Sequence, residues 1–265
     1  MKNRERRQHF YNFFCRIPAD FINRLTRREK VCLVLLLTFV FDYALPSTLY
    51  FHGLTGSTKW LLQENGPYEN LGAVAPFIGS IVLVRAYIKY PVGDSLGLFG
   101  GKRNIFLLLL ALFMFFVAGE EISWGQRLFG FSVPELISQI NFQRELNIHN
   151  LKIIQESNNA LAISATRLLL AYVILLPMIL SAFPAFKRLF ISMGIPFGSI
   201  QISLLALANY FIHVYLVSFD VFKKWTHDGL GEVFETNLEI VLLALAFEIH
   251  SSARERWTTA DGKRM

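Results

Sequence analysis

The sequence has few charged residues and almost no cysteine. Of its 265 residues, only 17% are Asp, Glu, Lys or Arg and only two are cysteines, Cys15 and Cys32, whereas 53% are hydrophobic. Two cysteines in or beside a basic N-terminal region exclude a disulfide framework, and we expect reduced thiols there if that end is cytoplasmic. So apolar a composition is atypical of a soluble domain and is typical of an integral membrane protein.

Other familiar signals are also missing. The formal net charge is +6, but no stripe of interleaved aromatic and basic residues accompanies it, so we expect no nucleic-acid partner. The basic N-terminal segment is not followed by a short apolar run with a small-residue cleavage site, which argues against a cleavable signal peptide. No internal repeat stands out, so the inverted-repeat pattern of many transporters is not found.

Apolar runs of bilayer length recur along the chain. A transmembrane helix needs about 20 predominantly apolar residues. We therefore predict an all-α fold, a polytopic transmembrane helical bundle of about six spans within residues 31–250. The predicted spans are 31–50, 71–90, 104–124, 160–184, 196–218 and 232–250.

The basic residues predict how the bundle is oriented. They are concentrated in the N-terminal segment 1–30, in the connections after the second and fourth spans, and in the tail 251–265. By the positive-inside rule, six spans then place both termini in the cytoplasm and the loops 51–70, 125–159 and 219–231 outside. Apolar residues recur at roughly helical intervals in the N-terminal segment, which predicts an amphipathic interfacial helix on an anionic cytoplasmic leaflet; a flexible basic tail is the alternative.

Two adjacent acids, Glu120 and Glu121, stand where the third span is still expected to run. Counted from Arg103 at the inner end, Glu120 lies about 25 Å along a helix, inside a hydrocarbon core of about 30 Å. Ionised carboxylates are costly there, so we expect them to face the bundle, find a partner or take up a proton. The alternative is an interfacial helix end, where both acids reach water and Trp124 is an aromatic anchor.

The last span carries three more acids on one helical stripe. Glu232, Glu235 and Glu239 are spaced i, i+3 and i+7, which places them on one side of a helix. Counted from Arg254, Glu239 lies about 22 Å from the inner end. Because like charges repel, we expect a cation, a proton or a basic partner among them.

Further polar residues are predicted at the same leaflet. Glu145 and His149 are four residues apart, a spacing that allows both to bind one metal or share a proton, although such pairs are also common on exposed helices. Arg167 is the expected counter-ion of one acid. Asn209 and His213 are expected to make interhelical hydrogen bonds. The remaining polar positions expected in this cluster are Asp42, Glu64, Glu69, Arg127 and Glu239.

The run EEISWGQRLFGF, with ELNIHN downstream, resembles a segment of bacterial multi-pass inner-membrane proteins that carry no assigned activity. The resemblance covers mainly residues 119–150 and more weakly 64–70, and it implies a bacterial inner-membrane location. Glu120, Glu121 and Arg127 are also similar to the EExxxR element of the intramembrane CAAX-processing proteases. Here five residues separate the glutamates from the arginine rather than three, and the FxxxH and HxxxN elements of that family are not found in suitable spans, so no protease activity is implied.

These observations leave three functions open. The first is a membrane-embedded hydrolase or transferase, metal-dependent or acid–base, which acts on a lipid or lipid-linked substrate at the outer leaflet. The second is a proton-coupled transporter or flippase, and the third is a non-catalytic membrane partner protein. For the enzyme, the candidate catalytic residues are Glu120, Glu121 and Glu232, and the candidate ligands of a divalent metal are His149, His227 and Glu235.

Overall fold

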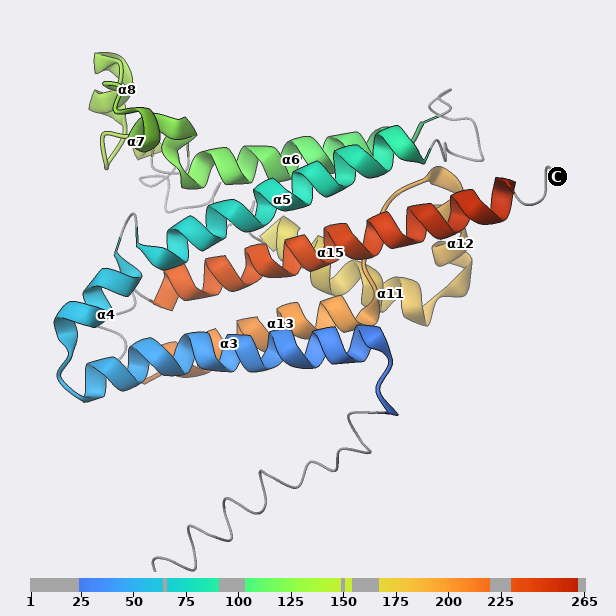
Figure 1. Cartoon of the computed structure of the whole chain (residues 1–265), viewed down its shortest axis with the longest axis horizontal. Helices are drawn as coiled ribbons and strands as arrows, with labels where there is room; N and C mark the ends of the chain where they lie inside the picture. The colour runs from blue at the N-terminus through green and yellow to red at the C-terminus, as the bar shows by residue number, and fades with distance from the viewer. Residues whose placement is uncertain are drawn as a thin grey trace, which may run out of the picture.

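The computed structural model is a bundle of helices (Figure 1). It describes residues 24–63, 66–90, 103–148, 151–153, 167–219 and 230–261, with the side chains of all but Arg127, Ala260 and Asp261. Within these ranges no strand forms, and the one β-type contact is an isolated bridge between Asn141 and Leu151. The prediction of an all-α fold is therefore confirmed.

The helices differ greatly in length. The longer ones are α3 (Arg27–Phe51), α5 (Pro67–Lys89), α6 (Ile105–Glu121), α13 (Ile200–Val217) and α15 (Leu230–Asp261). The shorter ones are α4 (Thr55–Leu62), α7 (Gln126–Phe129), α8 (Glu135–Ile140), α11 (Leu176–Ala182) and α12 (Pro184–Met193), with a 3₁₀ turn at Ser123–Gly125 and a π-helical turn at Ala171–Leu175.

Local sequence explains where several helices begin. A capping box starts α3, since the Glu29 amide donates to the Thr26 hydroxyl and the Thr26 amide donates to the Glu29 carboxylate. Pro67 stands at the start of α5, where no amide donor is needed. Asn104 caps α6 by accepting from the Phe106 amide, and its own amide group donates to the Gly194 carbonyl at 2.6 Å. The start of α6 is thereby joined to the end of α12.

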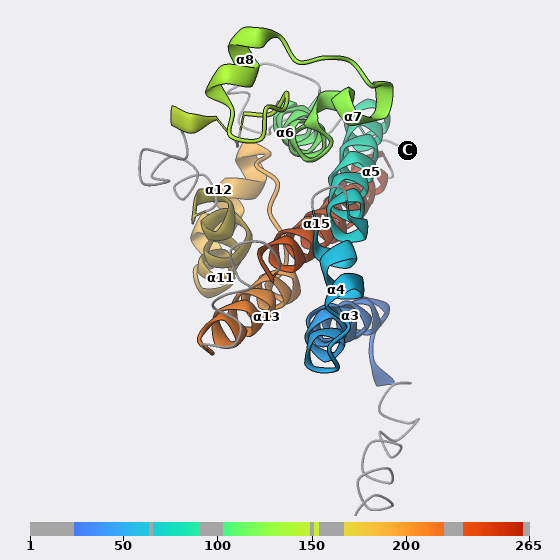
Figure 2. The same ribbon diagram turned by 90° about the vertical axis from the view of Figure 1, so that its left-hand side faces the viewer.

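The core follows α15, which lies between two groups of helices. It packs along α5, which in turn packs along α6, and on its other side it meets α13 and α3 (Figures 1 and 2). Leu83, Met114 and Val241 are fully buried where these helices meet. At Gly79 a Cβ would lie 2.8 Å from the Met114 sulfur, so the lack of a side chain lets α5 and α6 approach closely.

Large apolar side chains cover much of the outside of the bundle. Phe41, Ile81, Leu109 and Phe211 are each more than half exposed, which in water would form patches that a monomeric soluble protein rarely carries. Three helical stretches are long and apolar enough to cross a membrane, namely Arg27–Phe51, Thr55–Lys89 and Ile200–Val217. These features identify a membrane protein with at least three candidate spanning helices.

The structure agrees with only part of the predicted topology. The three candidate stretches overlap the first, second and fifth predicted spans, and the shorter apolar stretch Arg167–Ala182 overlaps the fourth. The total of six spans stays a prediction. The interfacial helix predicted over residues 1–30 lies mostly outside the described residues.

The predicted C-terminal tail is mostly helix. α15 continues to Asp261, beyond the predicted end of the last span at residue 250. Ile249 and Ala253 are buried and Trp257 packs against the same core, so the apolar stripe of α15 continues past the span and holds this segment to the bundle.

The bundle has two chemically different ends (Figure 1). The end of α6 and the start of α15 lie at one end, beside α4 and α7, and we call this the acidic end, with Glu121, Glu232, Glu235 and Glu239. The start of α3, all of α12 and the end of α15 lie at the other, and we call this the basic end, with Arg28, Lys187 and Arg256. The segments predicted to be cytoplasmic and described by the structure therefore meet at one end of the bundle.

Candidate functional site

A pair of carboxyl groups joins α6 to α15 at the acidic end. Glu121 is the last residue of α6 and is half-buried, whereas Glu239 lies two turns inside α15 and is only 6% exposed. Their carboxyl groups lie close enough to interact directly. Because two ionised carboxylates repel each other, a contact of this kind is favourable only when one of the two groups carries a proton.

The other acids of α15 surround this carboxyl pair with negative charge. Glu232 and Glu235 both interact electrostatically with Glu239, as expected for residues on one helical stripe. Glu232 is half-buried and Glu235 is exposed. Repulsion along the stripe adds to the cost of ionising both groups of the pair, and the sequence-based expectation of a cation, a proton or a basic partner among these acids stays a prediction.

A glycine makes room for the pair. At Gly72 of α5, an added Cβ would overlap the Glu239 Oε2 atom. One turn earlier on α15, the Thr236 hydroxyl donates to the Tyr68 carbonyl at 3.0 Å, which fixes the start of α5 against α15. The carboxyl of Glu239 is thus held in a space that exists because position 72 lacks a side chain.

Glu120, next to the pair in sequence, has a different set of partners. It is 6% exposed, and its two carboxylate oxygens accept from the Trp124 indole at 2.7 Å and from the Ile148 amide at 2.6 Å. Glu120 is therefore buried and hydrogen-bonded, and it does not reach water at a helix end as the alternative interpretation predicted. Its contacts make it a positioning residue for the chain that follows α6.

That chain turns sharply under the indole of Trp124. Ser123 and Trp124 have φ values of 47° and 53°, a left-handed conformation that costs free energy in residues with a side chain. A Cβ at Gly119 would lie 2.9 Å from the Trp124 ring, so the ring lies flat over the end of α6. The hydrogen bond from Trp124 to Glu120 helps to compensate for the strained turn.

The two segments EEISWGQR and ELNIHN bond directly to each other. The Ser123 hydroxyl donates to Glu145 at 2.7 Å, and the Leu146 amide donates to the Gln126 side chain at 2.8 Å. Asn147, which is buried, donates to Glu145 at 3.2 Å. These bonds and those of Glu120 fold the polar connection into a cap at the acidic end, beside α7 and α8 (Figure 2).

A second polar cluster lies on the other side of α15, around Tyr43, and consists of Asp42, Tyr43, Asn209, His213 and Asn237. The Tyr43 hydroxyl donates to Asn209 at 3.0 Å, and Asn209 donates to the Phe234 carbonyl at 2.9 Å. Asn209 therefore makes the interhelical bond that its position predicts.

Several polar atoms of this Tyr43 cluster are buried without a hydrogen bond among the described residues. They are Asp42 Oδ2, His213 Nδ1 and both amide atoms of Asn237. Asn237 was not a sequence candidate, although an asparagine two residues before Glu239 in an apolar helix was a signal that could have found it. Buried polar atoms of this kind call for water, an ion or a proton.

The remaining sequence candidates are spread over the structure. Glu69 lies in the first turn of α5 and Glu145 in the cap described above, whereas Arg167 is exposed and makes no ion pair within the described residues. Glu64, His149, His227 and the side chain of Arg127 lie outside the described residues. Asp42 belongs to the Tyr43 cluster and not to the carboxyl pair.

The predicted metal ligands are brought together only in part. Glu235 lies at the acidic end, but the two histidines expected beside it, His149 and His227, are among the residues not described. In the described part of the chain, no group of three or more His, Cys, Asp or Glu side chains is arranged to hold a metal ion. The metal site therefore stays a prediction.

Comparison with known proteins identifies no relative of this chain. No protein-family model matches the chain, and neither a curated protein nor a solved structure is significantly similar to it. The functional argument accordingly depends on the geometry of the acidic end.

Proposed function

We propose that this is a bacterial inner-membrane protein of six spans, with both termini cytoplasmic, whose acidic end performs acid–base chemistry on a lipid or lipid-linked substrate at the outer leaflet. The observation that carries the proposal is the close contact between the carboxyl groups of Glu121 and Glu239. Two carboxyl groups that share one proton can act as acid and base toward the same substrate, because one donates while the other stays ionised.

The two carboxyl groups have different roles in this proposal. Glu121 is half-buried at the end of α6, whereas Glu239 is buried, so Glu121 is the group that meets the substrate. Glu239 is buried and holds the shared proton in place. The exposed apolar sides of the bundle would let a lipid approach within the membrane, so its polar head would meet the acidic end.

The proposal includes a divalent metal, for which His149, His227 and Glu235 would be the ligands. Metal ligation by a carboxylate and two imidazoles would activate water near the carboxyl pair. Elemental analysis of the detergent-purified protein tests it, with a His227→Ala/Glu235→Ala double variant as the comparison. One near-stoichiometric metal lost in the double variant supports the site, and a folded wild-type protein without metal contradicts it.

A proton-coupled transporter is the second candidate, and the Tyr43 cluster favours it. Buried polar atoms lie on one side of α15 and the carboxyl pair lies on the other. Polar groups at such depth commonly mark proton or ion pathways in membrane proteins. In this case Glu239 would bind and release the proton as access to it alternates.

One reconstitution experiment separates these functions. Wild-type protein, Glu121→Gln and the matched control Glu135→Gln, an exposed acid of α8, are placed in vesicles of bacterial lipid extract that contain polyprenyl phosphate. We expect a changed lipid by mass spectrometry with wild type and control, and at least a 100-fold lower rate with Glu121→Gln, the usual scale of acid–base catalysis.

Other results of the same experiment decide against the enzyme. An unchanged lipid pool together with proton entry, followed by a pH-sensitive dye inside the vesicles, supports the transporter if Glu239→Gln stops the entry. Neither lipid turnover nor proton entry in folded protein contradicts both functions and favours a non-catalytic partner protein.

A further inference from the structure

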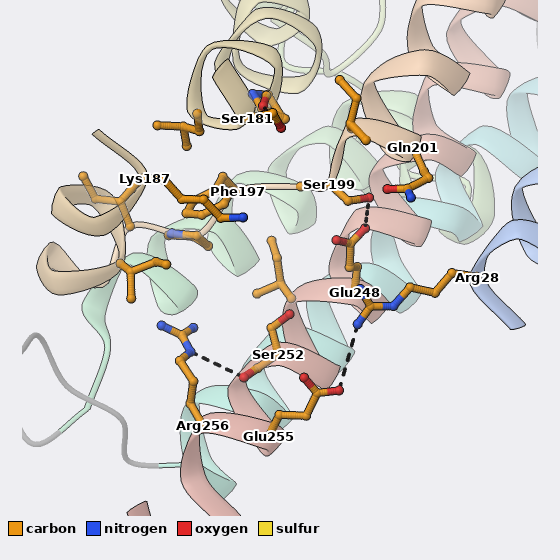
Figure 3. Close-up of a pocket in the computed structure, with 18 residues that line it drawn as sticks. Arg28, Ser181, Lys187, Phe197, Ser199, Gln201, Glu248, Ser252, Glu255 and Arg256 are labelled. Atoms are coloured by element: carbon orange, nitrogen blue, oxygen red, sulfur yellow. Dashed lines mark hydrogen bonds and ion pairs between the residues drawn. The ribbon is translucent and has the colours of Figure 1, made fainter. Parts of the chain in front are cut away.

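A cavity of about 400 Å³ lies at the basic end, far along α15 from the carboxyl pair (Figure 3). Its walls come from the start of α3, from α11 and α12, from the start of α13 and from the last turns of α15. The charged residues on these walls are Arg28, Lys187, Glu248, Glu255 and Arg256. All of them lie within the described residues, and none belongs to the acidic end.

The two acids of the cavity already have partners. Glu255 forms an ion pair with Arg28 at 3.9 Å, and Glu248 accepts a hydrogen bond from the Ser199 hydroxyl at 2.9 Å (Figure 3). The pair formed by Arg28 and Glu255 is exposed, with 58% and 71% of the side chains accessible. It contributes little to stability, but it neutralises one positive and one negative charge on this wall.

Lys187 and Arg256 are left as cations without a carboxylate. Neither has an acid within 4.0 Å among the described residues. The one hydrogen bond that Arg256 makes there is from its Nε atom to the Ser252 carbonyl at 3.4 Å. Figure 3 shows the two side chains reaching the cavity from different helices, α12 and α15. A ligand in the cavity could therefore contact both.

Arg256 is also removed from much of its water. Burial lowers the pKa of the Arg256 guanidinium, although an arginine stays charged at any physiological pH. A partly desolvated cation without a counter-ion is unfavourable, and a bound anion would compensate for the lost hydration.

The remaining walls suit a ligand with both an anionic and an apolar part. The first turn of α13, a helix of 18 residues, borders the cavity at Ser199 and Ile200, and its end carries partial positive charge. Leu180, Ile195 and Ile249 supply an apolar wall. The outside of the bundle next to this end is apolar as well.

We propose that this cavity binds a phosphate group between Lys187 and Arg256, and that the phosphate belongs to an anionic phospholipid of the adjoining leaflet, whose acyl chains follow the apolar wall. The proposal is independent of the chemistry at the acidic end. Glu248 is the one acid of the cavity without a basic partner, so its charge opposes the ligand and limits the affinity.

Native mass spectrometry of the full-length protein tests the proposal, with phosphatidylglycerol as the probe, and with phosphatidylcholine and inorganic phosphate as separate arms. We expect phosphatidylglycerol to bind best. Lys187→Ala and Arg256→Ala should each weaken its binding about tenfold, because each removes a charge-assisted hydrogen bond. Glu248→Gln, which removes the opposing charge, should strengthen it.

The chain offers two matched controls. Arg188→Ala on α12 and Arg254→Ala on α15 remove the same charge from neighbouring positions that do not line the cavity, and they should bind phosphatidylglycerol like wild type. An equal loss in the controls would show general surface attraction and overturn the site. Phosphatidylcholine binding as tightly as phosphatidylglycerol would also overturn it. Inorganic phosphate binding as tightly would overturn the lipid as occupant.

A failure of Lys187→Ala or Arg256→Ala to fold does not leave the proposal undecided. Glu248→Gln changes neither cation and keeps an acceptor for the Ser199 hydroxyl, so it should fold. Stronger phosphatidylglycerol binding by this variant supports the site, and unchanged or weaker binding contradicts it.

Discussion

A Gly72→Ala variant is expected to fold and yet to lose the proton shared by Glu121 and Glu239. The added Cβ takes the space of the Glu239 Oε2 atom, and a flexible carboxyl side chain can move where a packed backbone cannot. Alanine also favours a helix over glycine by about 0.5–1 kcal/mol, which offsets part of the cost. The displaced carboxyl then no longer meets Glu121.

Infrared spectroscopy measures this effect directly. In wild-type protein at neutral pH we expect the C=O stretch of a protonated carboxyl group, since two carboxyl groups in close contact are costly to ionise together. The band should vanish or shift in Gly72→Ala and in Glu239→Gln. Gly56→Ala is the matched control, because nothing lies within 4 Å of a Cβ at Gly56 of α4. An unchanged band in Gly72→Ala would falsify the position assigned to the pair.

Glu120→Ala is expected to release the polar cap from the end of α6. The substitution removes both hydrogen bonds made by the buried carboxylate, those from the Trp124 indole and the Ile148 amide. Hydrogen bonds to a charged group contribute about 1.5–3 kcal/mol each. The free energy that holds the cap on the end of α6 should therefore fall by about 3 kcal/mol or more. The strained backbone at Ser123 and Trp124 would then relax.

Hydrogen exchange and proteolysis report this loss locally. The Ile148 amide should exchange about 100-fold faster in Glu120→Ala, and trypsin should cut faster after Arg144, which is exposed. Glu135→Ala removes an exposed acid of α8 and should change neither rate. Equal protection of Ile148 in wild type and Glu120→Ala would show that Glu120 does not hold the cap.

Depth and periodicity explain why part of the acidic end was predictable. The spacing of Glu232, Glu235 and Glu239 is a property of one helix, so the stripe could be inferred without knowledge of any neighbour. The distance from the basic inner end likewise placed Glu121 at the level of that stripe. The helical bundle and its apolar surface followed from the same local signals.

The division of roles between Glu120 and Glu121 could not be inferred in this way. Adjacent residues on a helix point about 100° apart, so Glu120 and Glu121 cannot both face α15. Which of them does so depends on the bonds that Glu120 accepts from the Trp124 indole and from the amide of Ile148, a residue far along the sequence. Tertiary packing alone sets this choice.

The cavity at the basic end was hidden for a related reason. In the sequence, Lys187 and Arg256 indicate only how the helices are oriented in the membrane, because each belongs to a basic cluster at the end of an apolar run. The two side chains meet only because α12 lies beside the last turns of α15. The periodicity of the sequence does not predict this packing. The sequence shows that Asn237 stands in an apolar helix, but it does not show that both polar atoms of its amide are buried.

The length of α15 has a mechanical consequence. Glu239 and Arg256 belong to the same uninterrupted helix, about 25 Å apart along its axis at 1.5 Å per residue. Because α15 is one continuous helix, a shift along its axis at the carboxyl pair would also move one wall of the cavity at the basic end. Protonation at the acidic end and lipid occupancy at the basic end would then be thermodynamically linked, and by reciprocity each would change the free energy of the other equally.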